Sequence, residues 1–176
     1  MNVKRHTRAE AQEVMRRLKE LSCEELNGLF KQGRVPAFEE IEGKNPGIEL
    51  KWHPRNPVIN KLGWRFYGNN PLARWAGMEF IEPFNSDKKG NGYNLYQNRF
   101  WKRRYKYETY IDRAVSDNEP CLRINYRFPS PMFTGFDDAR MIDDGVLLAL
   151  AYAKREQISK SIPGFYWVSV TVEQQT

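Results

Sequence analysis

The sequence predicts a mainly β protein: a small antiparallel up-and-down barrel of about eight strands, preceded by two α-helices. Beyond Gly47, short apolar or alternating segments of strand length are separated by turn residues. Aromatic residues, which favour pleated and half-buried surfaces, make up 14% of the chain. Two apolar runs flank Asp143-Asp144-Gly145, and the Asp-Gly pair is typical of a tight hairpin. A meander of hairpins hides its sheet edges by closing into a barrel.

Length and composition favour a single domain over residues 1–176, because half of this chain would bury too small a core. No apolar run reaches the length of a membrane span, and the first seven residues lack the apolar core of a secretion signal. We therefore expect a cytoplasmic protein. Cys23 and Cys121 lie in unlike segments, which favours two small buried hydrophobes over a disulfide or a zinc site.

Two helix starts are visible in the first 33 residues. Thr7 to Glu10 and Ser22 to Glu25 both have the spacing of a capping box. Apolar residues follow each box at helical spacing, and Gly33 is a stop signal. We expect this helical pair, residues 7–32, to pack outside the barrel or to close one end of it.

The strands of the barrel, residues 48–172, follow from alternation and from turn signals. Residues 35–47 are rich in Pro and Gly and predict a turn region, in which Glu39, Glu40 and Glu42 form a solvated acidic rim. The sequence does not decide the structure of the segment 58–75, which is either a lid or a strand. Within it, Asn69-Asn70-Pro71 either starts a short helix or turns the chain. The expected strands are 48–53, 77–82, 93–100, 103–113, 121–128, 139–142, 146–153 and 165–171.

A small barrel holds either packed side chains or one small molecule, which makes ligand binding the leading functional hypothesis. Arg140 shares a strand face with Asp138, and the pair either lines the lumen or forms a surface salt bridge. The side chain of Arg123 likewise either lies inside the lumen or is solvated. The candidate ligand contacts are Trp75, Phe80, Tyr105, Tyr107, Arg123, Asn125, Arg140 and Trp167.

The expected ligand is a small hydrophobic molecule with an acidic or carbonyl group, oriented by arginine. The alternative is a cofactor-independent isomerase, cyclase or decarboxylase on the same barrel, with Tyr105 and Tyr107 as acids and Glu108 as base. No catalytic signature names a reaction, so the catalytic residues are unknown.

Other partners receive less support from the sequence. No metal site is expected, because His6 is assigned to a mobile terminus, and haem on His53 is a remote alternative to no cofactor. The basic and aromatic stretch 99–107 contributes to a net charge of +6, and it is read as an exposed strand face rather than a nucleic-acid site. The oligomeric state, a homodimer included, is left open.

Several segments resemble a calycin-like, or lipocalin-like, barrel family with a Trp-x-Gly-Lys-x-Phe signature. They are Trp75-Ala-Gly-Met-Glu-Phe80, the stretch 107–126, Asp138-Ala-Arg140, the stretch 144–152 and Phe165-Tyr-Trp-Val168. Met78 stands where the family has lysine, and Ala149 where glycine is usual. The resemblance implies a lipocalin-like barrel, a fold that hosts carriers, haem proteins and a few enzymes.

Overall fold

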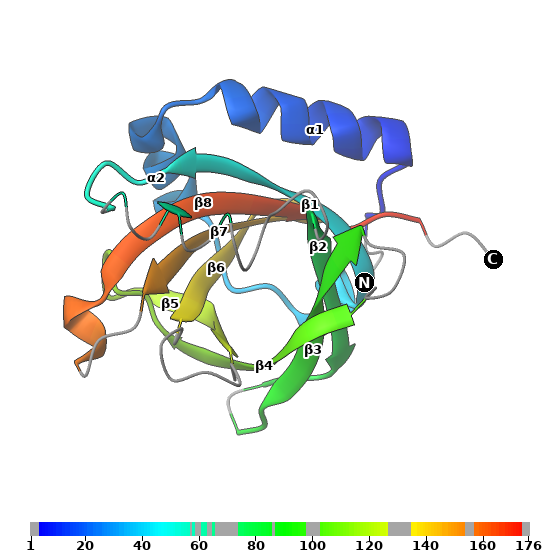
Figure 1. Ribbon diagram of the computed structural model, residues 1–176. Helices are drawn as coiled ribbons and strands as arrows, with labels where there is room; N and C mark the ends of the chain where they lie inside the picture. The colour runs from blue at the N-terminus through cyan, green and yellow to red at the C-terminus, as the bar shows by residue number, and fades with distance from the viewer. Residues whose placement is uncertain are drawn as a thin grey trace.

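A closed antiparallel barrel of eight strands forms the body of the molecule, as the hairpin pattern predicts (Figure 1). The computed structural model describes residues 4–56, 58, 61–62, 65, 74–85, 87–97, 103–126, 135–153 and 157–173. Each strand pairs with its sequence neighbours, and β8 closes the barrel on β1. The strands are β1 (Gly43–Trp52), β2 (Arg74–Glu82), β3 (Gly90–Gln97), β4 (Arg103–Arg113), β5 (Pro120–Tyr126), β6 (Gly135–Asp143), β7 (Val146–Ala153) and β8 (Ile162–Val170).

The two predicted helices are confirmed as α1 (Arg8–Glu20) and α2 (Cys23–Gln32). Both begin with a complete capping box, in which Thr7 pairs with Glu10 and Ser22 pairs with Glu25. Gly33 is the C-cap of α2. Figure 1 shows α1 lying across the outside of the barrel, beside β1 and β8. The helices therefore cover the wall of the barrel and leave its two ends to other segments.

Because the helices cover part of the outer wall, the protein has two apolar cores. The outer core joins Met15, Leu26 and Phe30 of the helices to outward-facing residues such as Leu148 and Val168. The inner core lies inside the barrel, and half of its buried members are aromatic. Burying both faces of β7 explains its nearly unbroken apolar sequence, which is unlike the strict alternation of a sheet with one wet face.

One end of the barrel, here called the α3 end, is closed by a short helix that the sequence did not predict. Helix α3 (Phe38–Ile41) and the early start of β1 at Gly43 replace the turn region expected over residues 35–47. Phe38 packs edge-to-face against Phe84, with ring centroids 6.2 Å apart. Glu40 is buried and pairs with Arg34, so the expectation of a solvated acidic rim is wrong for this residue.

The N-terminal segment is held in place, contrary to expectation. His6 is 5% exposed and pairs with Val172 beside the end of β8. The backbone carbonyl of Asp144 lies 2.8 Å from its Nε2. This contact is close because Gly145 has a φ of 71° in the confirmed β6–β7 turn, where a side chain would meet the carbonyl of Lys4.

Most strand limits agree with the predicted ones within a few residues, but β1, β2, β3, β6 and β8 begin three to five residues earlier. Most of residues 58–73, the predicted strand ends beyond Gln97 and Tyr126, and residues 99–102 of the basic stretch 99–107 lie outside the described residues, so the alternatives for the segment 58–75 stay open. Among the helices of the described part of the chain, none is long and apolar enough to span a membrane.

Candidate functional site: the barrel lumen

The inner core becomes progressively more exposed along the barrel axis. Near the α3 end, Phe80, Met141 and Leu147 are buried together with α3. At the opposite end, the inward-packed side chains are only half-buried; they are Trp52, Tyr105, Tyr126 and Ala151. The described side chains of the lumen are therefore least enclosed at the end opposite α3.

Asp137 is the most unusual side chain of the interior. In the sheet register it lies opposite Ile124 on β5 and Ala151 on β7, both of which belong to the inner core, so its carboxyl faces the lumen. The residue is 3% exposed. The hydroxyl of Tyr126 and Nε1 of Trp167 donate hydrogen bonds to Oδ2 over 2.5 and 2.9 Å. No described residue donates to Oδ1, and no described cation pairs with this carboxyl.

Burial raises the pKa of Asp137 to about 7, because a carboxylate loses most of its hydration inside the barrel. The hydrogen bonds from Tyr126 and Trp167 favour the ionised form but do not offset this loss, and the charge of Asp138 raises the pKa further. Asp137 therefore changes its protonation state near neutral pH. A group of this kind can accept a hydrogen bond when ionised and donate one when neutral.

A continuous series of aromatic contacts runs around the lumen through Asp137. Trp75 and Trp167 have ring centroids 5.6 Å apart, and Trp167 donates to Asp137. On the other side of the carboxyl, the rings of Tyr126 and Tyr107 are 5.9 Å apart. Asp137 is thus bracketed by two pairs of rings, an arrangement that combines apolar contact with a small number of polar groups.

The rings of this site are fixed by hydrogen bonds to neighbouring strands. Nε1 of Trp75 donates to Oδ1 of Asn94 over 2.8 Å, and the hydroxyl of Tyr107 donates to the carbonyl of Glu79 over 2.9 Å. Gly92 makes room for Tyr107, since a Cβ there would lie 2.5 Å from its hydroxyl oxygen. Burial raises the pKa of Tyr107 well above its usual value, so it stays a neutral donor.

Two further side chains extend the site. Tyr105 has a φ of 52° where the register between β3 and β4 shifts, and its ring lies 6.1 Å from that of Tyr96. Bulges of this kind re-aim a side chain. Glu49 lies opposite Trp167 in the β1–β8 register, which places it on the inner wall, and it is half-buried. The described lumen therefore carries two carboxyl groups.

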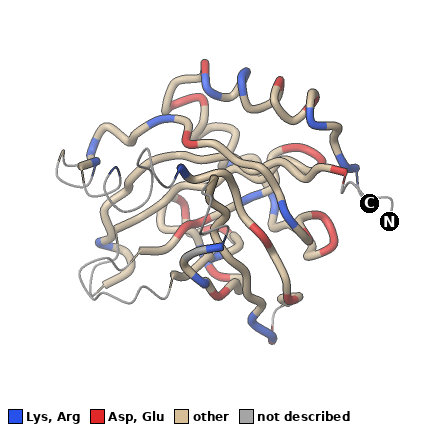
Figure 2. Tube along the Cα trace, turned by 45° about the vertical axis from the view of Figure 1, so that its right-hand side comes forward, with Lys and Arg blue, Asp and Glu red and all other residues tan. Residues whose placement is uncertain are grey.

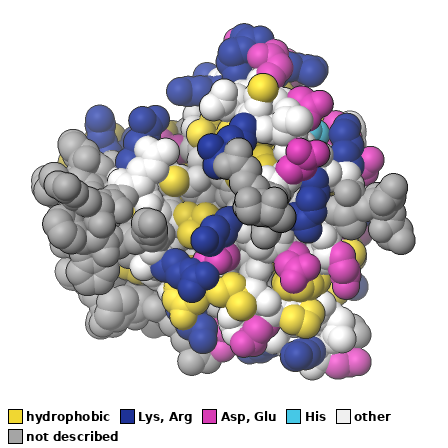
Figure 3. Space-filling view, turned by 90° about the vertical axis from the view of Figure 1, so that its right-hand side faces the viewer, with side chains coloured by type: hydrophobic (Ala, Val, Ile, Leu, Met, Phe, Trp, Pro, Cys, Tyr) yellow, Lys and Arg dark blue, Asp and Glu magenta, His cyan; other side chains and the backbone are white. Residues whose placement is uncertain are grey.

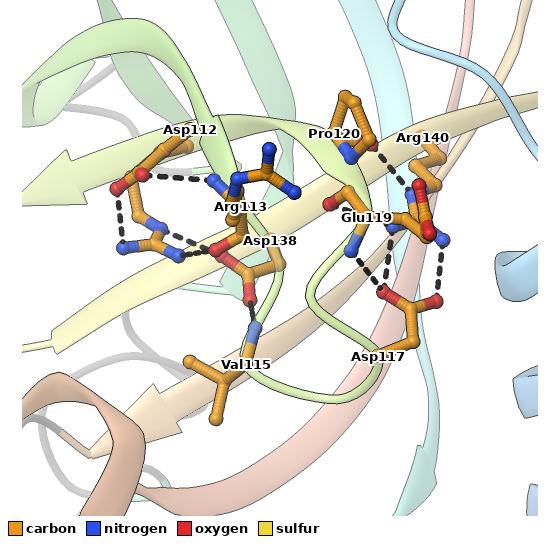
Figure 4. A network of polar contacts seen from close by, with 9 residues as sticks. Asp112, Arg113, Val115, Asp117, Glu119, Pro120, Asp138 and Arg140 are labelled. Atoms are coloured by element: carbon orange, nitrogen blue, oxygen red, sulfur yellow. Dashed lines mark hydrogen bonds and ion pairs between the residues drawn. The ribbon is translucent and has the colours of Figure 1, made fainter.

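Arg140 does not line the lumen, which corrects the leading expectation from the sequence. It lies opposite Leu148, a member of the outer core, and its guanidinium sits 4.6 Å above the ring of Phe30 in α2. Figure 4 shows its two terminal nitrogens directed at the carboxylate of Asp117, over 2.7 and 2.8 Å. It also donates to the carbonyl oxygens of Pro120, Glu119 and Phe30.

Arg123 and Asn125 also face outward. Arg123 is 1% exposed and donates to Asp138 over 2.6 Å and to Asp112 over 2.9 Å. Asp138 in turn accepts a hydrogen bond from the backbone of Val115, as Figure 4 shows. Asn125 lies opposite Phe136 of the outer core. The expected Asp138–Arg140 pair is therefore absent, because each residue has a different partner in a buried network that fixes the β4–β5 turn.

The remaining candidates have ordinary surroundings. Glu108, the candidate base, faces outward with Lys89 at 3.7 Å. Nδ1 of His53 accepts a hydrogen bond from the backbone of Arg55 just beyond β1. Arg103, from the described part of the basic stretch, pairs with Glu79 at 2.6 Å. Burial and Arg55 both lower the pKa of His53.

Charges elsewhere on the described surface are mixed. Figure 2 shows both acidic and basic residues along α1, and Arg16 pairs with both Glu13 and Glu20. The face in Figure 3 likewise shows both signs, with apolar side chains between them. A surface hollow of about 650 Å³ near the start of β1 is lined by both signs, including Arg5, Glu42, Lys44, Glu79 and Arg103.

Five of the eight predicted contacts lie together in the lumen, and the sequence-based prediction missed the carboxyl at their centre. The five are Trp75, Phe80, Tyr105, Tyr107 and Trp167. The missed groups are Asp137, Tyr126 and Asn94. A signal for Asp137 was present: consecutive residues of a strand point to opposite faces, so one of Asp137 and Asp138 has to face inward.

Comparison with known proteins supports the fold alone. No family model and no curated protein matches the chain. The chain is similar to a crystal structure described only as a protein from Thermomonospora curvata. The two share 15% sequence identity with a TM-score of 0.50, over 94% of this chain and 99% of the other. At this identity the match shows a shared barrel architecture and assigns no activity.

Proposed function

We propose that the barrel binds a small, largely apolar molecule whose polar end meets Asp137. The single observation that carries this proposal is a buried carboxyl, with no cationic partner among the described residues, at the centre of an aromatic lumen. A packed core gains nothing from such a group, because an uncompensated carboxyl costs free energy. Ligand sites, by contrast, combine apolar walls with a few oriented polar groups.

The proposed contacts are the inward-facing aromatic residues Trp75, Phe80, Tyr105, Tyr107 and Trp167, with Asp137 in the role first given to arginine. Arg123 and Arg140 face the outer core and are engaged by Asp138 and Asp117. In the described part of the lumen, an acidic ligand would therefore meet a carboxyl instead of a guanidinium. A hydrogen-bond donor, or a carbonyl facing the protonated carboxyl, fits the site better.

Native mass spectrometry of the freshly purified protein, with solvent extraction of the same sample, tests this proposal. We expect a stoichiometric small molecule that is lost on denaturation. Ala151→Trp fills the lumen beside Asp137 and should abolish this adduct, whereas Ala9→Trp on the exposed face of α1 should retain it. Equal occupancy in both variants would place the ligand elsewhere, and a wild-type protein that binds no small apolar molecule would refute the proposal.

A cofactor-independent enzyme is the second candidate, and one observation favours it. Asp137 has a pKa of about 7 and is hydrogen-bonded to Tyr126, so the pair could exchange a proton with a bound substrate near neutral pH. This assignment replaces Glu108, which lies outside the lumen. A pH–rate profile with a limb near pH 7 that disappears in Asp137→Asn would support catalysis.

Three broader expectations also stand as proposals. Kinship with calycin-like barrels is supported by Gly77 of the Trp-x-Gly segment, whose φ of 139° and close approach to the carbonyl of Asn45 require glycine. A single domain is supported by the outer core, which joins α1 and α2 to the barrel. A cytoplasmic location is supported by the two free cysteines, and cell fractionation would test it.

A further inference from the structure

We infer that the polar end of the ligand is a protonated amine, held between Asp137 and the surrounding aromatic rings. This inference rests on the proposed function, because it names the chemical class of molecule that the same lumen would take. It follows from three features of the site: the sign of its buried charge, the surfaces around that charge, and the position of the arginines.

The buried ionisable group at the centre of the site is an acid. Asp137 is held by two neutral donors, the hydroxyl of Tyr126 and the indole of Trp167, and both donate to Oδ2. No described donor reaches Oδ1. When ionised, this carboxyl would carry a buried charge that no described residue neutralises. An ammonium group supplies both the missing charge and the missing donor, and charge-assisted hydrogen bonds are stronger than neutral ones.

The surrounding surfaces favour a cation as well. The rings of Trp75 and Trp167 lie on one side of Asp137, and those of Tyr126 and Tyr107 on the other. The faces of tryptophan and tyrosine rings attract cations, and this attraction is larger where water is excluded. An aromatic enclosure with one carboxyl is a recurrent way of holding an alkylammonium group, since the rings also accept its carbon chain.

The positions of Arg123 and Arg140 argue against an anionic ligand. A lumen built for an anion would direct a guanidinium inward, but Arg123 and Arg140 point outward and are paired with acids. Glu49, the other carboxyl on the described inner wall, is an acid and supplies no positive charge. An anionic ligand would therefore be disfavoured in the described part of this lumen.

Three probes of matched shape test the inference by isothermal titration calorimetry at pH 7: 2-(1-naphthyl)ethylamine, 2-(1-naphthyl)ethanol and 1-naphthylacetate. We expect the amine to bind the wild-type protein at least about tenfold more tightly than the alcohol, and the carboxylate to bind most weakly. Asp137→Asn should bring the amine and the alcohol within about twofold of each other. Asp87→Asn, which makes the same change of charge in an exposed loop, should retain the preference.

A second measurement needs no variant. Because an ammonium group stabilises the ionised carboxyl, binding of the amine near pH 7 should release protons from the protein. The observed enthalpy should then differ between phosphate and Tris buffers for the amine, and the preference for amine over alcohol should grow from pH 5.5 to pH 8. This readout keeps the inference testable if Asp137→Asn does not fold.

The outcomes separate the two proposals. Equal binding of the amine and the alcohol to the wild-type protein would overturn the amine assignment and leave lumen binding intact. A preference that survives Asp137→Asn in full, or tighter binding of the carboxylate, would also overturn the assignment. If none of the three probes binds and no small molecule copurifies, both proposals fail.

Discussion

Asp137 is the residue on which the proposed function depends. It is an acid on the inner wall of an aromatic barrel, and its neighbour in sequence, Asp138, is an acid on the outer wall. Asp138 has Arg123 as a partner, whereas the donors to Asp137 among the described residues are neutral. The two residues have the same chemistry and opposite environments, because successive side chains of a strand face opposite sides of the sheet.

The raised pKa of Asp137 predicts how stability depends on pH. Between about pH 4 and pH 7 the unfolded chain loses its proton while the folded protein keeps it, so the free energy of unfolding falls as the pH rises. A shift from the ordinary value of 3.8 to about 7 corresponds to about 4 kcal/mol, fully lost above pH 7. Denaturant unfolding of the wild type and Asp137→Asn at pH 5 and pH 8 measures this effect.

The variant should gain stability relative to the wild type as the pH is raised, because asparagine has no charge to bury. Asp87→Asn, in an exposed loop, should show no such trend. A difference between Asp137→Asn and wild type that is the same at pH 5 and pH 8 would contradict the assignment of a raised pKa.

At the scale of single elements, the buried arginines hold the wall together. Arg140 on β6 bonds to Asp117 in the β4–β5 turn and to the end of α2 through the carbonyl of Phe30. Arg123 on β5 ties β6 to the end of β4. Both guanidinium groups are engaged in these contacts within the wall, so the role of the two arginines there is structural.

Arg140→Ala should therefore destabilise the fold by about 3 kcal/mol or more, because it leaves the carboxylate of Asp117 without its cation. Binding of lumen ligands to the folded fraction should not change. Arg16→Ala on exposed α1 is the control, and it should have little effect on stability. Denaturant unfolding and calorimetric titration of both variants check this. If Arg140→Ala lost ligand affinity while its stability was unaltered, Arg140 would instead belong to the binding site.

Strand β2 depends on Gly77 for its approach to β1. A Cβ at this position would lie 2.1 Å from the carbonyl oxygen of Asn45, and its φ of 139° disfavours any other residue. Gly77→Ala should cost about 3 kcal/mol or more of stability, measured by thermal or denaturant unfolding.

Gly28 provides the matched control, because nothing lies within 4 Å of a Cβ added there in the middle of α2. Gly28→Ala should stabilise the protein by about 0.5–1 kcal/mol. Equal effects of the two substitutions would show that the β1–β2 contact is not as close as described.

For the whole molecule, the architecture could be predicted from the sequence. Which side chains face the lumen could not. Capping boxes, the Asp144-Gly145 turn and strand-length apolar runs are local signals, and they predicted the helices, the hairpin and the closed barrel of about eight strands. The face of each strand is not a local property. Because the outer core buries β6 and β7 on both sides, alternation there did not distinguish the lumen from the outer wall.

The missed elements share a physical cause. Helix α3 is one short turn whose stability comes from packing Phe38 and Ile41 into the end of the barrel, a contact between distant segments. The register of β6, which turns Asp137 inward and Arg140 outward, is likewise set by pairing with β5 and β7.

The central claim, that Asp137 is the ligand-facing group of the lumen, is tested most directly by a pH titration of its carboxyl ¹³C resonance. The titration is repeated with saturating 2-(1-naphthyl)ethylamine. We predict an apparent pKa near 7 in the free protein, in agreement with its burial, and a clear decrease when the amine is bound. A carboxyl that titrates near its ordinary value, or one whose titration is unchanged by the bound probe, would contradict the account.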